Sequence, residues 1–385
     1  MALSKIDVAN MLTGEVPYAN VAKLPASKLE DDINFRNIII NGDMSLAQRG
    51  TSTSGITDGN TYHTVDRMKT QVVTAGTWTQ TQETDVPSGQ GFAKSLKMDC
   101  TTADASLGAD DFLIVRQDVE GQNLQYLKYG TSNAESVTMS FWVKSNKTGT
   151  YIIWLYHSGT SNKQISKSYT IDSANTWEKK TLTFAGDTAQ AFANDNDARL
   201  RVYFVLAAGS NSQSGTLATS WEAYVKANRA VGQVNLADST ANEWYVTGVQ
   251  LEAGQTSSDF EFLPYDVNRD RCYRYYYKVS SSGFRYVGWG QVDNDNNNIV
   301  AYIDFKTDMR AAPSAVETTG TAGNYKVREA LTYTCDNVPT FNNADIWYSA
   351  VSFKKSGITS SNGFAQGEML KCGMDGGYLA WSAEL

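Results

Sequence analysis

Cysteine is scarce in this sequence, and the few cysteines are far apart. The 385 residues contain four, with no C-x-x-C pair among them: Cys100, Cys272, Cys335 and Cys372. This spacing excludes a small disulfide-stapled scaffold and argues against a zinc site. We therefore expect four free thiols in a chain that folds in a reducing cytosol.

Long hydrophobic runs and clustered positive charge are missing as well. No stretch of about 18 apolar residues is present, so we expect no membrane-spanning helix. The N-terminal sequence MALSKIDVANMLTGEVP has no apolar core of the kind that a secretory signal peptide needs. The formal net charge is −8 and no segment is strongly basic, so nucleic acid and anionic membranes are poor partners.

Histidine is scarcer still, which limits the catalytic options. The two histidines, His63 and His157, lie far apart, and no Ser-His-Asp or Cys-His motif accompanies either of them. The acids at residues 110–111 and 195–197 would suit a glycosidase, but both groups lie in or beside Gly/Ala/Asn-rich turns and are better explained as solvated loop acids. We assign no catalytic residue and predict that the chain is not an enzyme.

One polar turn, at residues 293–297, suggests a metal site. Its sequence DNDNN begins like a calcium-binding EF-hand loop, which needs Gly at its sixth position and a bidentate Glu at its twelfth. Those positions hold Asn298 and Asp304, and predicted strands flank the turn, so a hairpin is the better interpretation. We assign no metal ligand and no cofactor, and calcium at the edge of a jelly roll stays open as the alternative.

Strand-forming patterns dominate from residue 36 onward. Short stretches alternate apolar and polar side chains between clusters of Gly, Ser, Asn and Asp, which is typical of β-strands. Clear examples are residues 70–81, 136–144, 151–157 and 200–207. A long series of such strands without a helical pattern between them predicts an antiparallel jelly-roll sandwich. A second series after residue 280 predicts a smaller β-sandwich.

The predicted fold class is therefore all-β, with four segments. They are an N-terminal segment at residues 1–35, a jelly roll at 36–265, a Tyr-rich linker element at 266–279 and a C-terminal β-sandwich at 280–385. The first segment has scattered apolar residues interrupted by prolines, so it is expected to be extended and to need a partner surface. We interpret it as an attachment or oligomerisation segment; a flexible tail is the alternative.

Aromatic residues are abundant, with nine Trp and 21 Tyr. Trp142 and Trp154 lie in the middle of predicted strands and are expected in the core. An exposed ring can cover the apolar face of a sugar while neighbouring amides and carboxylates bond its hydroxyls. Five aromatic residues that the strand pattern constrains less are the candidate carbohydrate contacts: Trp78, Trp221, Tyr224, Trp289 and Trp381.

Three groups of motifs resemble tail-fibre and receptor-binding proteins of tailed bacteriophages. The first is RNIIINGDMSLAQRG at residues 36–50, followed by YHTVDRM at 62–68. The second is VRQDVEG at 115–121 together with VTMSFWVKS at 137–145. The third is VTGVQLEAG, FEFLPYD and RCYRYYYKV, all within residues 242–279.

This resemblance implies a non-enzymatic virion structural protein, made in the bacterial host cytoplasm, that binds a host cell-surface glycan during adsorption. It also implies a homotrimer whose residues 1–35 attach to other virion tail proteins, and a jelly roll similar to a carbohydrate-binding module. Modules of that kind often hold calcium through an acid near the first strand and an Asp in the closing strand. Asp43 matches the first, but the closing strand YVTGV at 245–249 has no Asp.

Two rival functions stay open at this point. One is a head-decoration or tail-scaffold protein that binds only other virion proteins and has no receptor role. The other is a capsule depolymerase, although the long β-helix repeats of most such enzymes are absent from the sequence.

Overall fold

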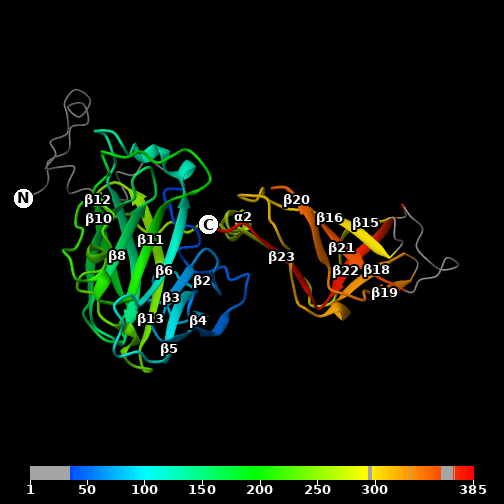
Figure 1. The fold of residues 1–385 in the computed structure, drawn as a ribbon, viewed down its shortest axis with the longest axis horizontal. Coiled ribbons are helices and arrows are strands. Elements are labelled where there is room, and N and C mark those ends of the chain that lie inside the picture. The colour runs from blue at the N-terminus through cyan, green and yellow to red at the C-terminus, as the bar shows by residue number, and fades with distance from the viewer. Residues whose placement is uncertain (1–34, 294–296, 330, 357–366, 368) are drawn as a thin grey trace, which may run out of the picture.

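The computed structural model describes residues 35–385 except 294–296, 330, 357–366 and 368. Figure 1 shows two β bodies arranged along the long axis, with a short helix between them. Every strand pairing between described residues is antiparallel, for example β11 with β6 and β15 with β16. This confirms the predicted all-β class. The predicted attachment segment falls outside the described residues except for Phe35.

The first body is a sandwich of two antiparallel sheets, which we call the large sandwich. Its six-stranded sheet has the order β1 (Ser52–Ile56), β4 (Thr77–Glu83), β5 (Ser95–Thr102), β13 (Glu243–Ala253), β7 (Val137–Ser145) and β10 (Glu178–Phe184). Its seven-stranded sheet has the order β12 (Glu222–Ala223), β9 (Lys163–Ile171), β8 (Gly149–His157), β11 (Ala198–Ala208), β6 (Phe112–Glu120), β3 (Lys69–Val73) and β2 (Gly59–Tyr62). The predicted closing strand, β13, lies inside its sheet between β5 and β7.

The side chains of β8 show how the large sandwich builds its core. Successive side chains of a strand point to opposite faces of the sheet. Ile153 and Leu155 point inward and join the main core between the two sheets. Ile152 and Trp154 point outward and join a separate apolar cluster on the outer face of the seven-stranded sheet. Trp154 is thus buried, as expected, but it lies outside the core that separates the two sheets.

The second body contains two further sheets. The three-stranded sheet has the order β14 (Tyr276–Ser280), β23 (Tyr378–Ser382) and β17 (Glu317–Thr318). The seven-stranded sheet has the order β19 (Thr332–Thr334), β18 (Tyr325–Arg328), β22 (Met369–Asp375), β15 (Phe284–Val292), β16 (Asn298–Asp304), β21 (Tyr348–Lys354) and β20 (Thr340–Ala344). A second hydrophobic core, which includes Trp381 and Phe353, fills this body.

Helical structure is short. The α-helix α2 (Tyr265–Tyr273) lies between the two bodies in Figure 1. The 3₁₀ helices are Gly121–Leu127, Ser210–Ser212, Lys226–Asn228, Leu236–Asp238 and Ala322–Asn324. Among the described residues no helix has the length and apolar character needed to cross a membrane. The predicted linker element at 266–279 includes most of α2 and of β14, and the domain boundaries placed there stay a prediction.

Residues just after α2 connect the two bodies. Arg274 donates two hydrogen bonds to the Glu120 carboxylate at the end of β6, at 2.8 and 2.7 Å. The hydroxyl of Tyr275 donates to the same carboxylate. Glu120 is fully buried, so these donors supply the partners that a charge removed from water requires.

Candidate functional site

A cleft of about 640 Å³ lies on the outer face of the seven-stranded sheet of the large sandwich. Its floor comes from β2, β3, β6, β8 and β11, which are neighbours in that sheet (Figure 1). One wall comes from the segment that follows β12, which contributes Tyr224, Lys226 and Arg229. The cleft is therefore built mainly on rigid paired strands, with one wall from a connecting segment.

Five aromatic side chains line this cleft: Phe112, Trp154, Tyr156, Tyr203 and Tyr224. Trp154 on β8 pairs directly with Tyr203 on β11, and their rings stack with centroids 4.1 Å apart and planes 22° apart. The ring of Tyr224 lies 6.1 Å from that of Trp154 and 5.6 Å from that of Tyr156. Trp154 and Tyr203 are each 4% exposed, whereas Tyr224 is 37% exposed. The cluster thus has a buried base and an accessible aromatic rim.

Arginine side chains lie against these rings. The guanidinium carbon of Arg116 is 5.4 Å from the centroid of Tyr203, and that of Arg201 is 5.5 Å from Tyr156. Arg229 lies 5.3 Å from the centroid of Trp154. A guanidinium over an aromatic face is attracted by the ring quadrupole, so these contacts hold the arginines beside the aromatic surface.

Acidic partners neutralise only part of this positive charge. Nε of Arg116 lies 3.1 Å from Oδ1 of Asp118, and Nε of Arg201 lies 3.8 Å from the same oxygen. Lys226 forms an ion pair with Asp110 at the mouth of the cleft. Arg229 instead donates to Oγ of Ser212, at 2.9 and 3.2 Å, and to the hydroxyl of Tyr224 at 3.4 Å.

The cleft offers stacking surfaces and donors rather than catalytic acids. Nε1 of Trp154 is buried and has no hydrogen-bond acceptor among the described residues. Asp110 is the one acid among the described residues that line the cleft. Because glycoside hydrolysis generally needs two carboxyl groups flanking the bond, this arrangement suits binding of a polyol better than its cleavage. The described residues also contain no cluster of three His, Cys, Asp or Glu side chains that could hold a metal ion.

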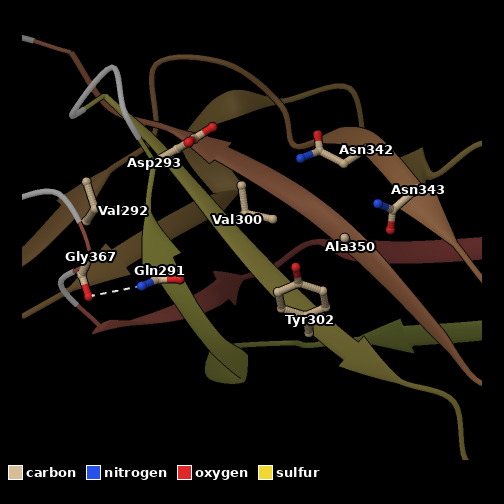
Figure 2. A pocket seen from close by; sticks show the side chains of 9 residues that line it. All are labelled: Gln291, Val292, Asp293, Val300, Tyr302, Asn342, Asn343, Ala350 and Gly367. Atoms are coloured by element: carbon tan, nitrogen blue, oxygen red, sulfur yellow. Dashed lines mark hydrogen bonds between the residues drawn. The ribbon is translucent and has the colours of Figure 1, made fainter.

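A second hollow, of about 360 Å³, lies on the seven-stranded sheet of the C-terminal body. Figure 2 shows its lining, with Tyr302 from β16 and two asparagines from β20, Asn342 and Asn343. Tyr302 is 58% exposed. It is the single aromatic residue in the described lining, which includes no Lys or Arg, so this hollow has fewer of the groups that recognise a ligand.

Two of the predicted carbohydrate contacts are core residues. Trp78 and Trp381 are both 0% exposed. Trp78 donates its Nε1 hydrogen to the carbonyl of Ala75 at 2.7 Å, and Trp381 packs beside Tyr277 and Phe305. A ring without exposed surface cannot stack on a sugar, so the prediction for these two residues is wrong.

The other three predicted contacts lie in separate places. Tyr224 lines the cleft. Trp221 packs beside Tyr129 and donates to the carbonyl of Ala185 at 2.6 Å, and it is not among the residues that line the cleft. Trp289 lies on β15 of the C-terminal body and is 55% exposed. The five candidates therefore do not form one site, and ligand contact at Trp221, Tyr224 and Trp289 stays a prediction.

Sequence reasoning missed most of the cleft. Trp154 was assigned to the core, and Tyr156, Tyr203 and the arginines were not singled out. In β8 both sets of alternating positions are apolar or aromatic, so the pattern does not show which set faces outward. Arg116 and Arg201 are far apart in the sequence and come together because β6 pairs with β11. The pairing of Trp154 with Tyr203 would have indicated an aromatic surface at this place. That pairing can be recognised only when the strand order is known.

Comparisons with known proteins identify no family. No family model and no curated protein matches this chain. Solved structures similar to it include the enzymatically active domain of tailspike protein 4 from bacteriophage CBA120, at 12% identity and a TM-score of 0.30, over 57% of this chain and 21% of that one. This chain thus matches about a fifth of the tailspike chain's length.

Two other similar structures have names that mention a sugar. One is a putative sugar binding protein from Bacteroides thetaiotaomicron, at 11% identity and a TM-score of 0.30, over 56% of this chain and 99% of that one. The other, TmCBM61 in complex with β-1,4-galactotriose, has 10% identity and a TM-score of 0.27, over 57% of this chain and 99% of that one. At these values the likenesses establish neither a family nor a ligand.

Proposed function

We propose that this chain is a non-enzymatic bacteriophage tail-fibre or appendage protein that binds a glycan of the host cell surface, and that the cleft on the large sandwich holds the sugar. The observation that best supports this proposal is the aromatic cluster of Trp154, Tyr203 and Tyr224, with amide and guanidinium groups around it. Aromatic faces cover the apolar side of a pyranose, and the neighbouring donors bond its hydroxyls.

The virion role rests on the motifs that resemble phage tail-fibre proteins, at residues 36–68, 115–145 and 242–279. In this proposal three copies assemble, and residues 1–35 attach them to other tail proteins. One shallow cleft binds a sugar weakly, and several linked copies raise the overall affinity without any new contact. Attachment to a repetitive cell-surface polysaccharide fits that arrangement.

The test is a binding and competition experiment with the assembled full-length protein. Labelled protein is added to host cells and to their extracted surface polysaccharide, and the same protein is then tested for blocking phage adsorption. We expect saturable binding that blocks adsorption. A folded protein that binds neither cells nor polysaccharide contradicts the receptor role and favours the head-decoration or scaffold alternative. Release of reducing ends from the polysaccharide would instead indicate a depolymerase.

Substitutions in the cleft then locate the site. Tyr224→Ala removes the exposed ring at the rim and should weaken binding about tenfold, the loss expected when one stacked ring and its hydroxyl contact are removed. Tyr126→Ala is the matched control, because Tyr126 is 49% exposed and is not among the residues that line the cleft. Equal loss in both variants would show that binding occurs elsewhere.

A further inference from the structure

We propose that the cleft selects an acidic glycan, whose anionic group binds the arginines beside the aromatic surface. This inference rests on the proposed glycan-binding function and adds the chemical class of the ligand. The supporting observation is an excess of positive charge in one cleft of a protein whose formal net charge is −8.

The charges around the cleft do not balance. Four cationic side chains line it: Arg116, Arg201, Lys226 and Arg229. Two carboxylates lie within salt-bridge distance of them among the described residues, Asp110 and Asp118. Four positive charges less two negative charges leave an excess of two. Because the whole chain is acidic, such a local excess does not follow from composition.

Asp118 cannot fully neutralise both of its arginines. A single oxygen of its carboxylate faces Nε of Arg116 at 3.1 Å and Nε of Arg201 at 3.8 Å. The side chain of Asp118 is 1% exposed and that of Arg116 is 8% exposed, so this pair forms the fixed base of the site. The side chain of Arg201 is 32% exposed and reaches the open cleft. Arg201 is therefore available to an incoming anion.

Arg229 supplies the second uncompensated charge. Its hydrogen-bond partners are neutral hydroxyls, those of Ser212 and Tyr224, and no carboxylate lies within salt-bridge distance among the described residues. Burial lowers the pKa of Arg229, which is the direction expected when a cation is removed from water. An anion bound beside Arg229 would compensate its charge.

Guanidinium groups are suited to binding an anionic group because of their shape. Their planar set of donors bonds a carboxylate, sulfate or phosphate through two parallel hydrogen bonds, and they remain charged under all ordinary conditions. A neutral sugar would use the aromatic rings but leave the excess charge of Arg201 and Arg229 without a partner. A sugar that carries an anion satisfies both parts of the cleft, the rings and the arginines.

The test uses matched pairs of glycans. Full-length protein is applied to an array in which carboxylated, sulfated and phosphorylated oligosaccharides each stand beside the neutral glycan of the same linkage. The array also carries the host surface polysaccharide before and after chemical reduction of its carboxylates to alcohols. We expect at least about tenfold tighter binding to an acidic member than to its neutral partner, as lost charge-assisted hydrogen bonds imply. The member that binds identifies the type of anion.

The outcomes separate this inference from the proposed function. Equal or tighter binding to neutral members overturns the acidic preference and leaves glycan binding intact. No binding to any array member or to the host polysaccharide overturns both. Raised salt should weaken the acidic interaction, because screening reduces attraction between charges at a surface.

Charge-removing variants assign the preference to the arginines. Arg201→Gln and Arg229→Gln should each reduce the ratio of acidic to neutral binding several-fold, because Gln keeps a neutral hydrogen-bond donor and loses the charge. Arg328→Gln makes the same change on β18 of the C-terminal body and should leave the ratio unchanged. If the two cleft variants keep the wild-type ratio while unfolding like the wild type, the arginines do not select the ligand.

Discussion

Arg67 of the large sandwich donates a side-chain hydrogen bond to Glu384, although 317 positions separate the two residues in the sequence. The side chains are 1% and 6% exposed, so the ion pair is buried. Arg67 also donates to the carbonyl of Asp118 at 2.7 Å and lies 3.5 Å from the ring centroid of Tyr275. The last residues of the sequence are thereby fixed to the large sandwich, beside the strand that carries part of the cleft.

Replacing Glu384 with Gln should destabilise the protein strongly. The substitution leaves the guanidinium of Arg67 buried without its carboxylate, and breaking a buried pair in this way costs about 3–5 kcal/mol. Denaturant unfolding of both proteins measures the loss. Glu135→Gln is the control, because Glu135 pairs with Lys128 at the surface, where an ion pair contributes about 0–1 kcal/mol. Similar losses in the two variants would contradict a structural role for the Arg67–Glu384 pair.

Most strands of this protein could be predicted from sequence, but the site could not. One strand prediction is wrong, because residues 70–81 form parts of two strands, β3 and β4, that belong to different sheets. The hairpin predicted from the turn at 293–297 is present: β15 ends at Val292, β16 begins at Asn298, and the two strands pair antiparallel. Alternation identifies a strand because it depends on neighbouring residues alone. The cleft depends on which strands pair and on which face the segment after β11 covers. Those relationships join residues such as Arg116 and Arg201, which local sequence does not connect.

Burial of single aromatic residues was equally hard to predict. Trp78 is fully buried although its strand is polar at most positions, and its indole hydrogen has an acceptor three residues earlier, at Ala75. Local hydrogen bonding of this kind removes the usual penalty for burying the indole N–H. The exposure of Trp289, by contrast, follows from its place on the outer face of a C-terminal strand, and pattern alone did not distinguish the two residues.

Acid should destabilise the large sandwich through His157. Burial lowers the pKa of His157 to about 4 from an ordinary value of 6.5, and Asp187, 3.4 Å away, opposes this shift only in part. The unfolded chain therefore takes up the proton first as the pH falls. The stability that a neutral His157 provides is complete above pH 6.5 and is lost between pH 6.5 and pH 4, on the order of 3 kcal/mol in total.

Asp66 acts with the opposite sign over nearly the same range. Burial raises its pKa to about 6 from 3.8, so its contribution to stability grows as the pH falls from 6 to 3.8. Urea unfolding at several pH values tests both assignments. His157→Asn should lose less stability than the wild type between pH 6.5 and pH 4, and Asp66→Asn should lose more. Parallel profiles for all three proteins would rule out both groups as the source of the pH dependence.

Gly248 should not tolerate a side chain. Its φ is +61°, and a Cβ added there would lie 2.5 Å from Cζ of Phe92, which packs against Phe260 and Phe262. Gly248→Ala combines backbone strain with overpacking and should cost about 2–4 kcal/mol. Gly254→Ala is the control, because Gly254 has a φ of +114° but open space at the Cβ position. Gly254→Ala should lower the free energy of unfolding by less than Gly248→Ala in the same assay. Equal losses would show that Phe92 moves aside at little cost.

Trp154→Phe separates the binding role of this residue from its packing role. The substitution keeps an aromatic ring against Tyr203 but removes the buried Nε1 hydrogen, which has no acceptor among the described residues. Removing an unpaired buried donor costs the folded protein little, so the free energy of unfolding should change by less than about 1.5 kcal/mol, the packing cost of the smaller ring. If Nε1 donates to the bound sugar, glycan affinity should fall about five- to tenfold.

Isothermal titration calorimetry with the polysaccharide measures the affinity of Trp154→Phe, and thermal unfolding measures its stability. Unchanged affinity at unchanged stability would mean that the sugar does not reach the base of the cleft and contacts only its rim, where Tyr224 lies.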